Sequence, residues 1–226
     1  MKIQRCLVMG WWIVSLLIFA CGSQDEKIES LIEKLKNPNP AVCLKATRAL
    51  VKIGTPAVPA LIEALDDGIW SGPGTATDAL GQIGLPAVPA LIETFRKGEK
   101  DVHTKAVMAL TQIGAPAVPA LTETLKETDA TVRSWAVFAL GKIGTPAVPA
   151  LMGVLSDEDS WVRSRAVWGL VSIGETDPSV VRFLTEALKD EKGLGHDDAV
   201  FALKQIGTPE ALKAVEAFEK GRGSGQ

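Results

Sequence analysis

The sequence predicts an all-α fold in which similar pairs of helices stack into a solenoid. The first observation is a motif, Ile-Gly-x-Pro-Ala-Val-Pro-Ala-Leu, that recurs with a period of 30 residues and starts at Ile53, Ile83, Ile113 and Ile143. Shorter copies begin at Ile173 and Ile206. The second observation is that each period contains two segments with helical spacing of apolar residues. A fixed period of this size is typical of repeat proteins, whose units bury their apolar faces against one another.

The first helix of a unit is predicted over residues 55–65. Its apolar stripe has helical spacing and consists of Val58, Leu61, Ile62 and Leu65. Thr55 suits the N-cap, and Pro56 suits the first helical position, where its missing N–H removes no hydrogen bond. Pro59 does remove a backbone hydrogen bond, so we expect the regular helix to begin only near that residue.

The second helix is clearest over Thr131 to Ile143. Its inward face consists of Val132, Ala136, Ala139, Leu140 and Ile143. Two of these residues are alanines, which allow a neighbouring helix to approach closely. Gly144 is predicted to end the helix in a left-handed conformation, which is accessible to glycine.

The pattern repeats along almost the whole chain. We count six helical pairs between Ser23 and Ile206, followed by a last helix from about Pro209 to Lys220. Ser23 and Glu26 form a capping box that opens the first helix. The solenoid is therefore assigned to residues 21–220, and the tail 221–226, which has no apolar residue, is expected to be disordered.

These repeats resemble those of a known family. The Gly-Thr-Pro-Ala-Val-Pro-Ala-Leu turn is followed by Val132-Arg133-Ser134-x-Ala136 and, one unit later, by Val162-Arg163-Ser164-x-Ala166. This combination resembles HEAT-like repeats of the short class named after phycocyanobilin lyases. The resemblance implies a right-handed α-solenoid with first helices on the convex side and second helices on the concave side. It implies little about function, because such repeats serve scaffolds, lyases and nucleic-acid enzymes alike.

The first 20 residues resemble an export signal. Lys2 and Arg5 precede an apolar stretch from Cys6 to Ala20, which is too short for a membrane span of about 20 residues. The sequence Ile-Phe-Ala-Cys that ends at Cys21 resembles a bacterial lipobox, which implies cleavage after residue 20 and a lipid on Cys21. The alternatives are an uncleaved anchor or an ordinary signal peptide.

Composition adds two constraints on function. Removal of residues 1–20 deletes two basic residues and no acidic one, so the net charge changes from −3 to −5. An exported protein with this charge has no general electrostatic reason to bind nucleic acid. Cys43 is then the only thiol, so no intramolecular disulfide is expected, and we predict that it is a small packing residue.

The sequence predicts no catalytic residue, metal or cofactor. His103 and His196 lie three repeats apart, and because packed helices are spaced by about 8–10 Å, they cannot share a metal ion. No Gly-rich phosphate loop, Gly-x-Ser-x-Gly turn or Cys-x-x-Cys pair occurs. The chain is therefore predicted not to be an enzyme.

Positions that differ between repeats are the candidates for partner binding. Adjacent registers of the second helix hold polar or charged residues near the N-terminus and gain aromatic residues in the last three units, namely Trp135, Phe138, Trp161, Trp168 and Phe201. Large exposed apolar side chains usually mark interaction sites, and an extended peptide or a helix could occupy such a platform. The alternative is that these rings fill space between repeats over Gly141 and Gly169, where small residues leave room.

The second unit departs from the pattern over residues 68–74, which contain three glycines and one proline. Its second helix is therefore expected to begin near Thr75. Trp70 lies in this segment, which is either a tolerated surface loop or a binding loop at the edge of the groove.

Together these features predict a lipid-anchored protein of the bacterial cell envelope, facing the periplasm or the exterior, that acts as a scaffold for another protein or peptide through its concave face. The alternative is a bilin lyase-like or other ligand-handling enzyme, which the resemblance implies. Nucleic acid is not an expected partner.

Overall fold

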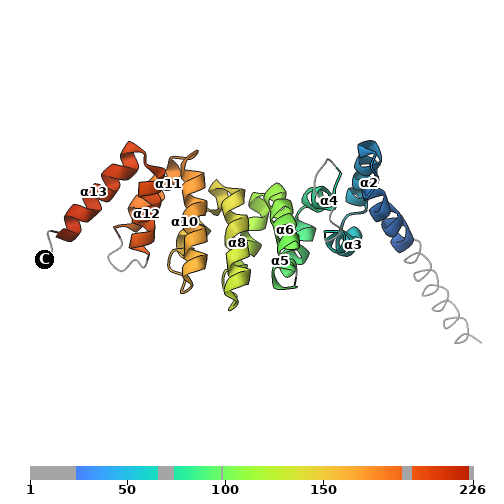
Figure 1. The fold of residues 1–226 in the computed structure, drawn as a ribbon, viewed down its shortest axis with the longest axis horizontal. Coiled ribbons are helices and arrows are strands. Elements are labelled where there is room, and N and C mark those ends of the chain that lie inside the picture. Colours follow the sequence, from blue (N-terminus) through green and yellow to red (C-terminus); the bar gives the residue numbers. More distant parts are fainter. Residues whose placement is uncertain (1–23, 66–73, 98, 190–194, 224–226) are drawn as a thin grey trace, which may run out of the picture. The chain divides into compact units, whose positions relative to one another are not determined.

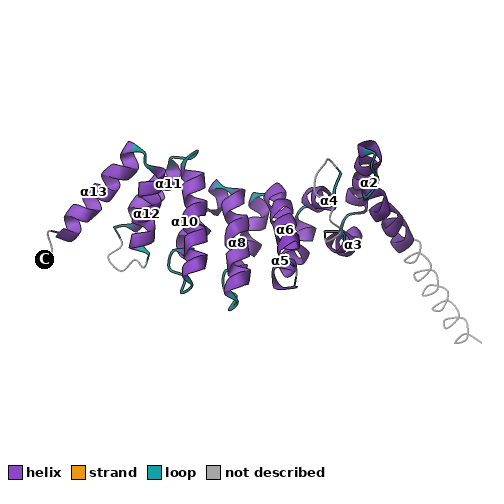
Figure 2. Cartoon of the chain, in the orientation of Figure 1, coloured by secondary structure: helices purple, strands orange, loops and turns teal. Residues whose placement is uncertain are grey.

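The computed structural model describes residues 24–65, 74–97, 99–189 and 195–223. Within these ranges the chain forms thirteen α-helices and no strand (Figure 2). None of the described helices is long and apolar enough to span a membrane. The predicted lipidation site Cys21, the capping residue Ser23 and the candidate contact Trp70 lie outside the described residues.

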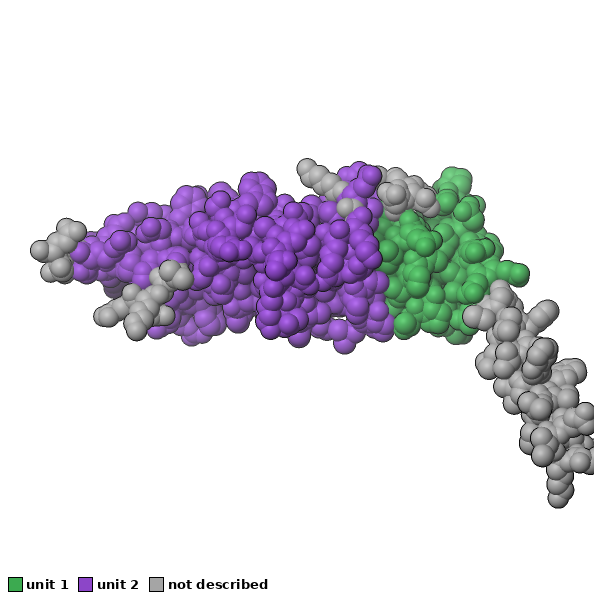
Figure 3. All heavy atoms as spheres, turned by 90° about the horizontal axis from the view of Figure 1, so that it is seen from below, with its two compact units in different colours: residues 1–83 green, residues 84–226 purple. Residues whose placement is uncertain are grey.

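The chain forms two compact units, residues 1–83 and 84–226 (Figure 3). The helices of the first unit are a helix over residues 24–35, α2 (Pro40–Ile53), α3 (Val58–Glu63) and α4 (Ala76–Ile83). Those of the second unit are α5 (Val88–Lys97), α6 (Lys100–Ile113), α7 (Val118–Thr124), α8 (Ala130–Ile143), α9 (Val148–Val154), α10 (Ser160–Gly174), α11 (Ser179–Ala187), α12 (His196–Ile206) and α13 (Pro209–Gly223). This arrangement confirms the predicted all-α solenoid of helical pairs.

In the second unit the second helices of successive pairs pack side by side. Helix α8 contacts both α6 and α10, and α10 contacts α12 in turn (Figure 1). The first helices α7, α9 and α11 pack against the same layer from one side. The outer side of the α6–α8–α10–α12 layer is called the second-helix face below.

The turn between helical pairs follows the repeated motif closely. A short 3₁₀ turn covers Thr55–Ala57, and α3 begins at Val58. This confirms that regular helix starts next to Pro59. Gly144 has a positive φ of 93°, as predicted, but its ψ of −147° lies outside the left-handed helical region. Its N–H still bonds to the Leu140 carbonyl, while the extended ψ directs the chain into the next 3₁₀ turn.

The core is a column of leucines and alanines that repeats with the motif. The fully buried leucines of the second helices are Leu50, Leu80, Leu110, Leu140, Leu170 and Leu203. Their burial confirms the predicted inward face. Helix α13 continues to Gly223, beyond the expected end at Lys220, and residues 224–226 lie outside the described ranges.

The predicted start of α4 is also confirmed. Thr75 precedes the helix, and its hydroxyl accepts a hydrogen bond from the Asp78 N–H at 3.2 Å. The Asp78 carboxylate in return accepts a bond from the Thr75 N–H at 3.5 Å. This reciprocal pair satisfies N–H groups at the start of the helix that would otherwise lack partners.

Candidate functional site

One register of the second helix is occupied by polar residues that serve the fold. Arg133 on α8 is buried and forms two hydrogen bonds with the Asp157 carboxylate, at 2.9 and 2.8 Å. Its Nη1 donates to the carbonyl oxygens of Glu127 and Thr128, just after α7. Burial is the largest single influence and would raise the pKa of Asp157. The hydrogen bond from Arg133, the backbone hydrogen bond from Asp159 and the charges of Arg133 and Arg163 together outweigh burial and lower that pKa below its usual value.

The same register has the same role in other repeats. Arg163 bonds to the carbonyls of Asp157 and Glu158 and pairs with Asp198. Cys43, in the first unit, directs its thiol at the carbonyls of Leu35 and Asn37, at 3.3 and 3.0 Å. Cys43 is thus a buried packing residue, as predicted, that also bonds to the end of the preceding helix.

The aromatic registers divide into a buried and an exposed group. Trp135 is only 8% exposed. Its ring stacks on Phe95 of α5, with centroids 6.4 Å apart, and lies 4.9 Å from the ring of His103 of α6. Trp135 therefore fills space between helical pairs. This corrects the prediction that it belongs to the exposed set.

The other aromatic residues of the set are accessible to a partner. Trp161 is 64% exposed, Trp168 55% and Phe201 44%, whereas Phe138 is half-buried. Trp168 meets Phe201 edge-on, with a centroid distance of 6.2 Å, so the aromatic surface continues from α10 to α12. These four residues place exposed apolar area on the second-helix face, as one of the two sequence interpretations predicts.

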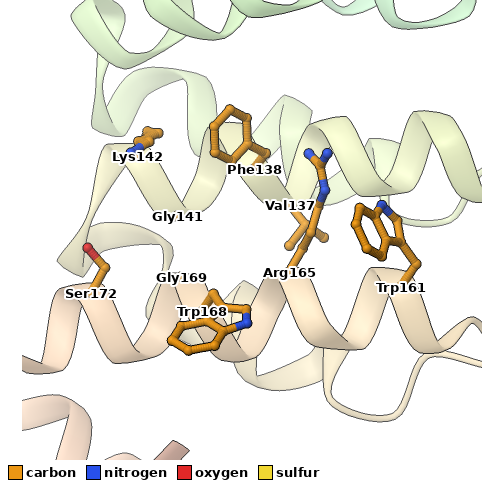
Figure 4. A pocket seen from close by; sticks show the side chains of 9 residues that line it. All are labelled: Val137, Phe138, Gly141, Lys142, Trp161, Arg165, Trp168, Gly169 and Ser172. Carbon is orange, nitrogen blue, oxygen red and sulfur yellow. The ribbon is translucent and has the colours of Figure 1, made fainter. Parts of the chain in front are cut away.

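Three of these rings line a cleft of about 360 Å³ between α8 and α10, called here the α8–α10 cleft. Figure 4 shows the cleft and its nine lining residues, Val137, Phe138, Gly141, Lys142, Trp161, Arg165, Trp168, Gly169 and Ser172. The lining combines aromatic walls with two cationic side chains and one hydroxyl. None of these nine described residues is acidic.

The floor of the cleft depends on two glycines that face each other across the helix pair. A Cβ atom added to Gly141 would lie 3.1 Å from the Gly169 Cα, and one added to Gly169 would lie 3.3 Å from the Gly141 Cα. The helix backbones therefore approach closely, and no side chain fills the space above them. The sequence interpretation in which rings cover these glycines is incorrect for Trp168, which remains exposed beside them.

Arg165 is the polar centre of the cleft. Its side chain extends from α10 toward α8, and the guanidinium ends between the rings of Phe138 and Trp161 (Figure 4). The guanidinium carbon lies 4.8 Å from the centroid of Trp135, 5.1 Å from Phe138 and 5.7 Å from Trp161. Burial lowers the pKa of Arg165, because the surrounding rings remove water from the charged group. Arginine nevertheless stays protonated at physiological pH.

Lys142 supplies the second positive charge, with its Nζ 5.5 Å from the centroid of Phe138. Phe138 thus has a cation on each side, Lys142 and Arg165. The sequence analysis did not identify either cation as part of the site. The available signal was that Arg165 shares the register of Trp135, which also holds the cations Lys45 and Lys105.

The histidines have aromatic neighbours. His103 packs against Phe95 and Trp135, and His196 lies 5.3 Å from the ring of Phe218. Among the described residues, no group of three or more His, Cys, Asp or Glu side chains is arranged to hold a metal ion.

Solved structures with similar folds are distant in sequence. The complex of CpcE and CpcF of phycocyanin lyase from Nostoc sp. PCC7120 gives 22% identity and a TM-score of 0.45, over 60% of this chain and 87% of that chain. Human deoxyhypusine hydroxylase in complex with glycerol gives 21% identity and a TM-score of 0.35, over 84% and 77%. An engineered protein gives 21% identity and a TM-score of 0.34, over 86% and 97%. With TM-scores below 0.5, these structures support no conclusion about this chain.

The family itself is established by sequence. A comparison with curated proteins returned no match. The profile of HEAT repeats, in contrast, matches residues 28–111, 58–140 and 118–194, which together span most of the chain. The recurring turn, the paired helices and the leucine column of the structure agree with that match. The chain belongs to the HEAT repeat family.

Proposed function

We propose that this HEAT repeat protein is a non-enzymatic, lipid-anchored scaffold of the bacterial cell envelope that holds a partner protein or peptide in the α8–α10 cleft. The observation that carries the proposal is the exposure of Trp161, Trp168 and Phe201 around that cleft. Exposed rings of this size in water are unfavourable unless a partner covers them, and tryptophan is enriched among the residues that dominate binding energy.

The form of the cleft supports a partner with an extended backbone. It runs along two neighbouring helices, and the glycines at its floor leave room for a chain to approach closely. Its side chains offer apolar contact and positive charge, and both can bind a partner protein. Repeat proteins generally use such long surfaces to hold other proteins.

Affinity capture from bacterial membranes tests the binding role. The full-length chain serves as bait beside two variants, Trp168→Ala in the cleft and Phe183→Ala on α11. Phe183 is an exposed aromatic residue outside the cleft and is therefore the matched control. We expect a protein that is recovered with the wild type and with Phe183→Ala but is lost with Trp168→Ala. Equal recovery with all three baits would contradict the proposed site.

The membrane anchor is tested separately. The apolar stretch of the predicted signal ends directly before Cys21, so Cys21→Ser is expected to abolish labelling by a fatty-acid probe and to block processing. A variant that combines Cys6→Ser and Cys43→Ser controls for acylation of the two other thiols, because Cys6 remains in an unprocessed chain. Unchanged labelling and membrane retention in Cys21→Ser would refute the anchor.

The cleft volume also favours a second candidate, a protein that handles a small ligand such as a bilin, because about 360 Å³ lies within the usual range of ligand pockets. Titration of the purified chain with bilin distinguishes the two. A saturable absorbance change that Trp168→Ala removes would favour ligand handling over the scaffold.

A further inference from the structure

We propose that the α8–α10 cleft recognises an acidic peptide segment, in which a carboxylate binds Arg165 and an adjacent large apolar side chain packs against the tryptophans. This inference rests on the proposed scaffold function and adds the chemical class of the segment that the partner presents.

Arg165 has unused hydrogen-bonding capacity. A guanidinium has five N–H donors. The described structure gives Arg165 one hydrogen bond, from Nη1 to the Ser134 carbonyl at a long 3.4 Å, and no ion pair with a described carboxylate. A partly buried guanidinium gains most from a carboxylate, which accepts two parallel N–H bonds.

The other arginines of α8 and α10, Arg133 and Arg163, each have a carboxylate partner within the chain. Arg133 binds Asp157 through two N–H groups, and Arg163 binds Asp198 at 3.1 Å. Both also bond to main-chain carbonyls. Arg165 has the same guanidinium group but pairs with no described carboxylate. A carboxylate from a partner would therefore supply the hydrogen-bond acceptors that Arg133 and Arg163 find within the chain.

Arg165 is held in place before any partner binds. Its charge lies over the rings of Trp135, Phe138 and Trp161, each within 6 Å. Such contacts attract the cation to the ring faces and restrict its motion. Less conformational entropy is then lost when an anion binds.

No acidic side chain among the described residues that line the cleft neutralises its positive charge. The three acidic residues just before α10 already have partners. Asp157 and Glu158 pair with Arg133, and Asp159 caps the helix by accepting from the N–H groups of Trp161 and Val162. Lys142, on the other side of Phe138, adds to the positive potential. The cleft thus has two cations without a carboxylate, which complements an anionic segment.

The aromatic walls of the cleft indicate that the bound peptide also presents an apolar side chain. Trp161 and Trp168 are largely exposed, and Gly141 and Gly169 beside Trp168 add no side chain (Figure 4). A leucine or phenylalanine side chain fits this chemistry. Nucleic acid also combines anions with rings, but the net charge of −3 and the presence of only two cations in the cleft disfavour a phosphate backbone.

Selection from a phage-displayed library of random peptides tests the inference on the full-length chain. We expect the enriched peptides to contain Asp or Glu within a few positions of a large apolar residue. In a selected peptide, replacement of the acid by its amide is expected to weaken binding about tenfold or more, as loss of a charged hydrogen bond does. Arg165→Leu is expected to cause a similar loss.

Two variants control for indirect effects. Arg182 on α11 also lies over an aromatic ring, Phe183, at 5.8 Å, and is outside the cleft, so Arg182→Leu should leave affinity unchanged. Lys142 is exposed, so Lys142→Gln should keep the fold and weaken binding by a smaller factor that grows at low salt. This second cleft variant keeps the test valid if Arg165→Leu fails to fold.

The outcomes separate this inference from the proposed function. Enriched peptides without an acidic excess, or with equal affinity for the wild type, Arg165→Leu and Lys142→Gln, would overturn the acidic class and leave the scaffold intact. If no peptide depends on Trp168, the scaffold site itself is refuted. Displacement of a bound peptide by single-stranded oligothymidylate would assign the cleft to nucleic acid.

Discussion

Trp135 and Trp168 lie on neighbouring second helices and in adjacent registers of the repeat, yet their surroundings are opposite. Phe95 and His103 enclose the ring of Trp135. The ring of Trp168 stands beside Gly141 and Gly169, which offer no side chain to cover it. The helix register therefore determines which way a ring points, while the residues of the neighbouring helical pair determine whether that ring is buried.

The same contrast separates stability from binding. A buried ring replaces contact with water by contact with other side chains and so stabilises the fold. An exposed ring keeps its contact with water and can be removed at little cost to the fold. We therefore expect the two tryptophans to affect different measurements.

The largest expected effect is the loss of stability when the buried Trp135 is replaced. Trp135→Ala leaves a cavity between α5, α6 and α8, so it is expected to lower the free energy of unfolding by about 3–5 kcal/mol. Denaturant unfolding of the full-length chain measures this. Trp168→Ala, the matched variant, is expected to cost less than about 1 kcal/mol. Equal losses for the two variants would end the distinction between buried and exposed rings.

Leu140 tests which face of α8 belongs to the core. It is fully buried, so Leu140→Ala is expected to cost about 2–5 kcal/mol by the same assay. A loss below about 0.5 kcal/mol would mean that the face assigned to the core is misplaced, and the assignment of the cleft residues would be misplaced with it.

For the exposed Trp168, replacement by alanine is expected to weaken binding of a captured partner or selected peptide by about 2 kcal/mol. This is the usual size of the effect for a residue at the centre of a binding site. Isothermal calorimetry measures the change, with Phe183→Ala as the control. Retained affinity in Trp168→Ala would remove the central residue of the proposed site.

The smallest expected effect concerns Arg133 and Asp157, on the packed side of α8. The pKa of Asp157 is lowered in the folded chain, so its contribution to stability is present above its unfolded pKa of about 3.9 and is lost as the pH falls through the folded value. Asp157→Asn is therefore expected to be less stable than the wild type at neutral pH, with a difference that narrows at acidic pH. A constant difference across this range would show that the pair does not titrate with folding.

The fold was largely predictable, because the 30-residue period and the leucine and alanine positions determine each helix pair and its inward face. The site was predictable only in part. Sequence placed Trp161, Trp168 and Phe201 in outward registers, but it could not show that Phe95 covers Trp135, since those residues lie 40 positions apart in different repeats. Arg165 was missed for a related reason: its role depends on three rings from two helices that meet only in space.

Hydroxyl-radical footprinting of the full-length chain, with and without a selected acidic peptide, tests the central claim most directly. It reports the accessibility of each aromatic side chain in one experiment. The account predicts that the peptide lowers oxidation of Trp161 and Trp168, that Phe183 is oxidised equally in both samples, and that Trp135 resists oxidation throughout. Unchanged oxidation of Trp168 in the presence of saturating peptide, or protection of Phe183 instead, would contradict it.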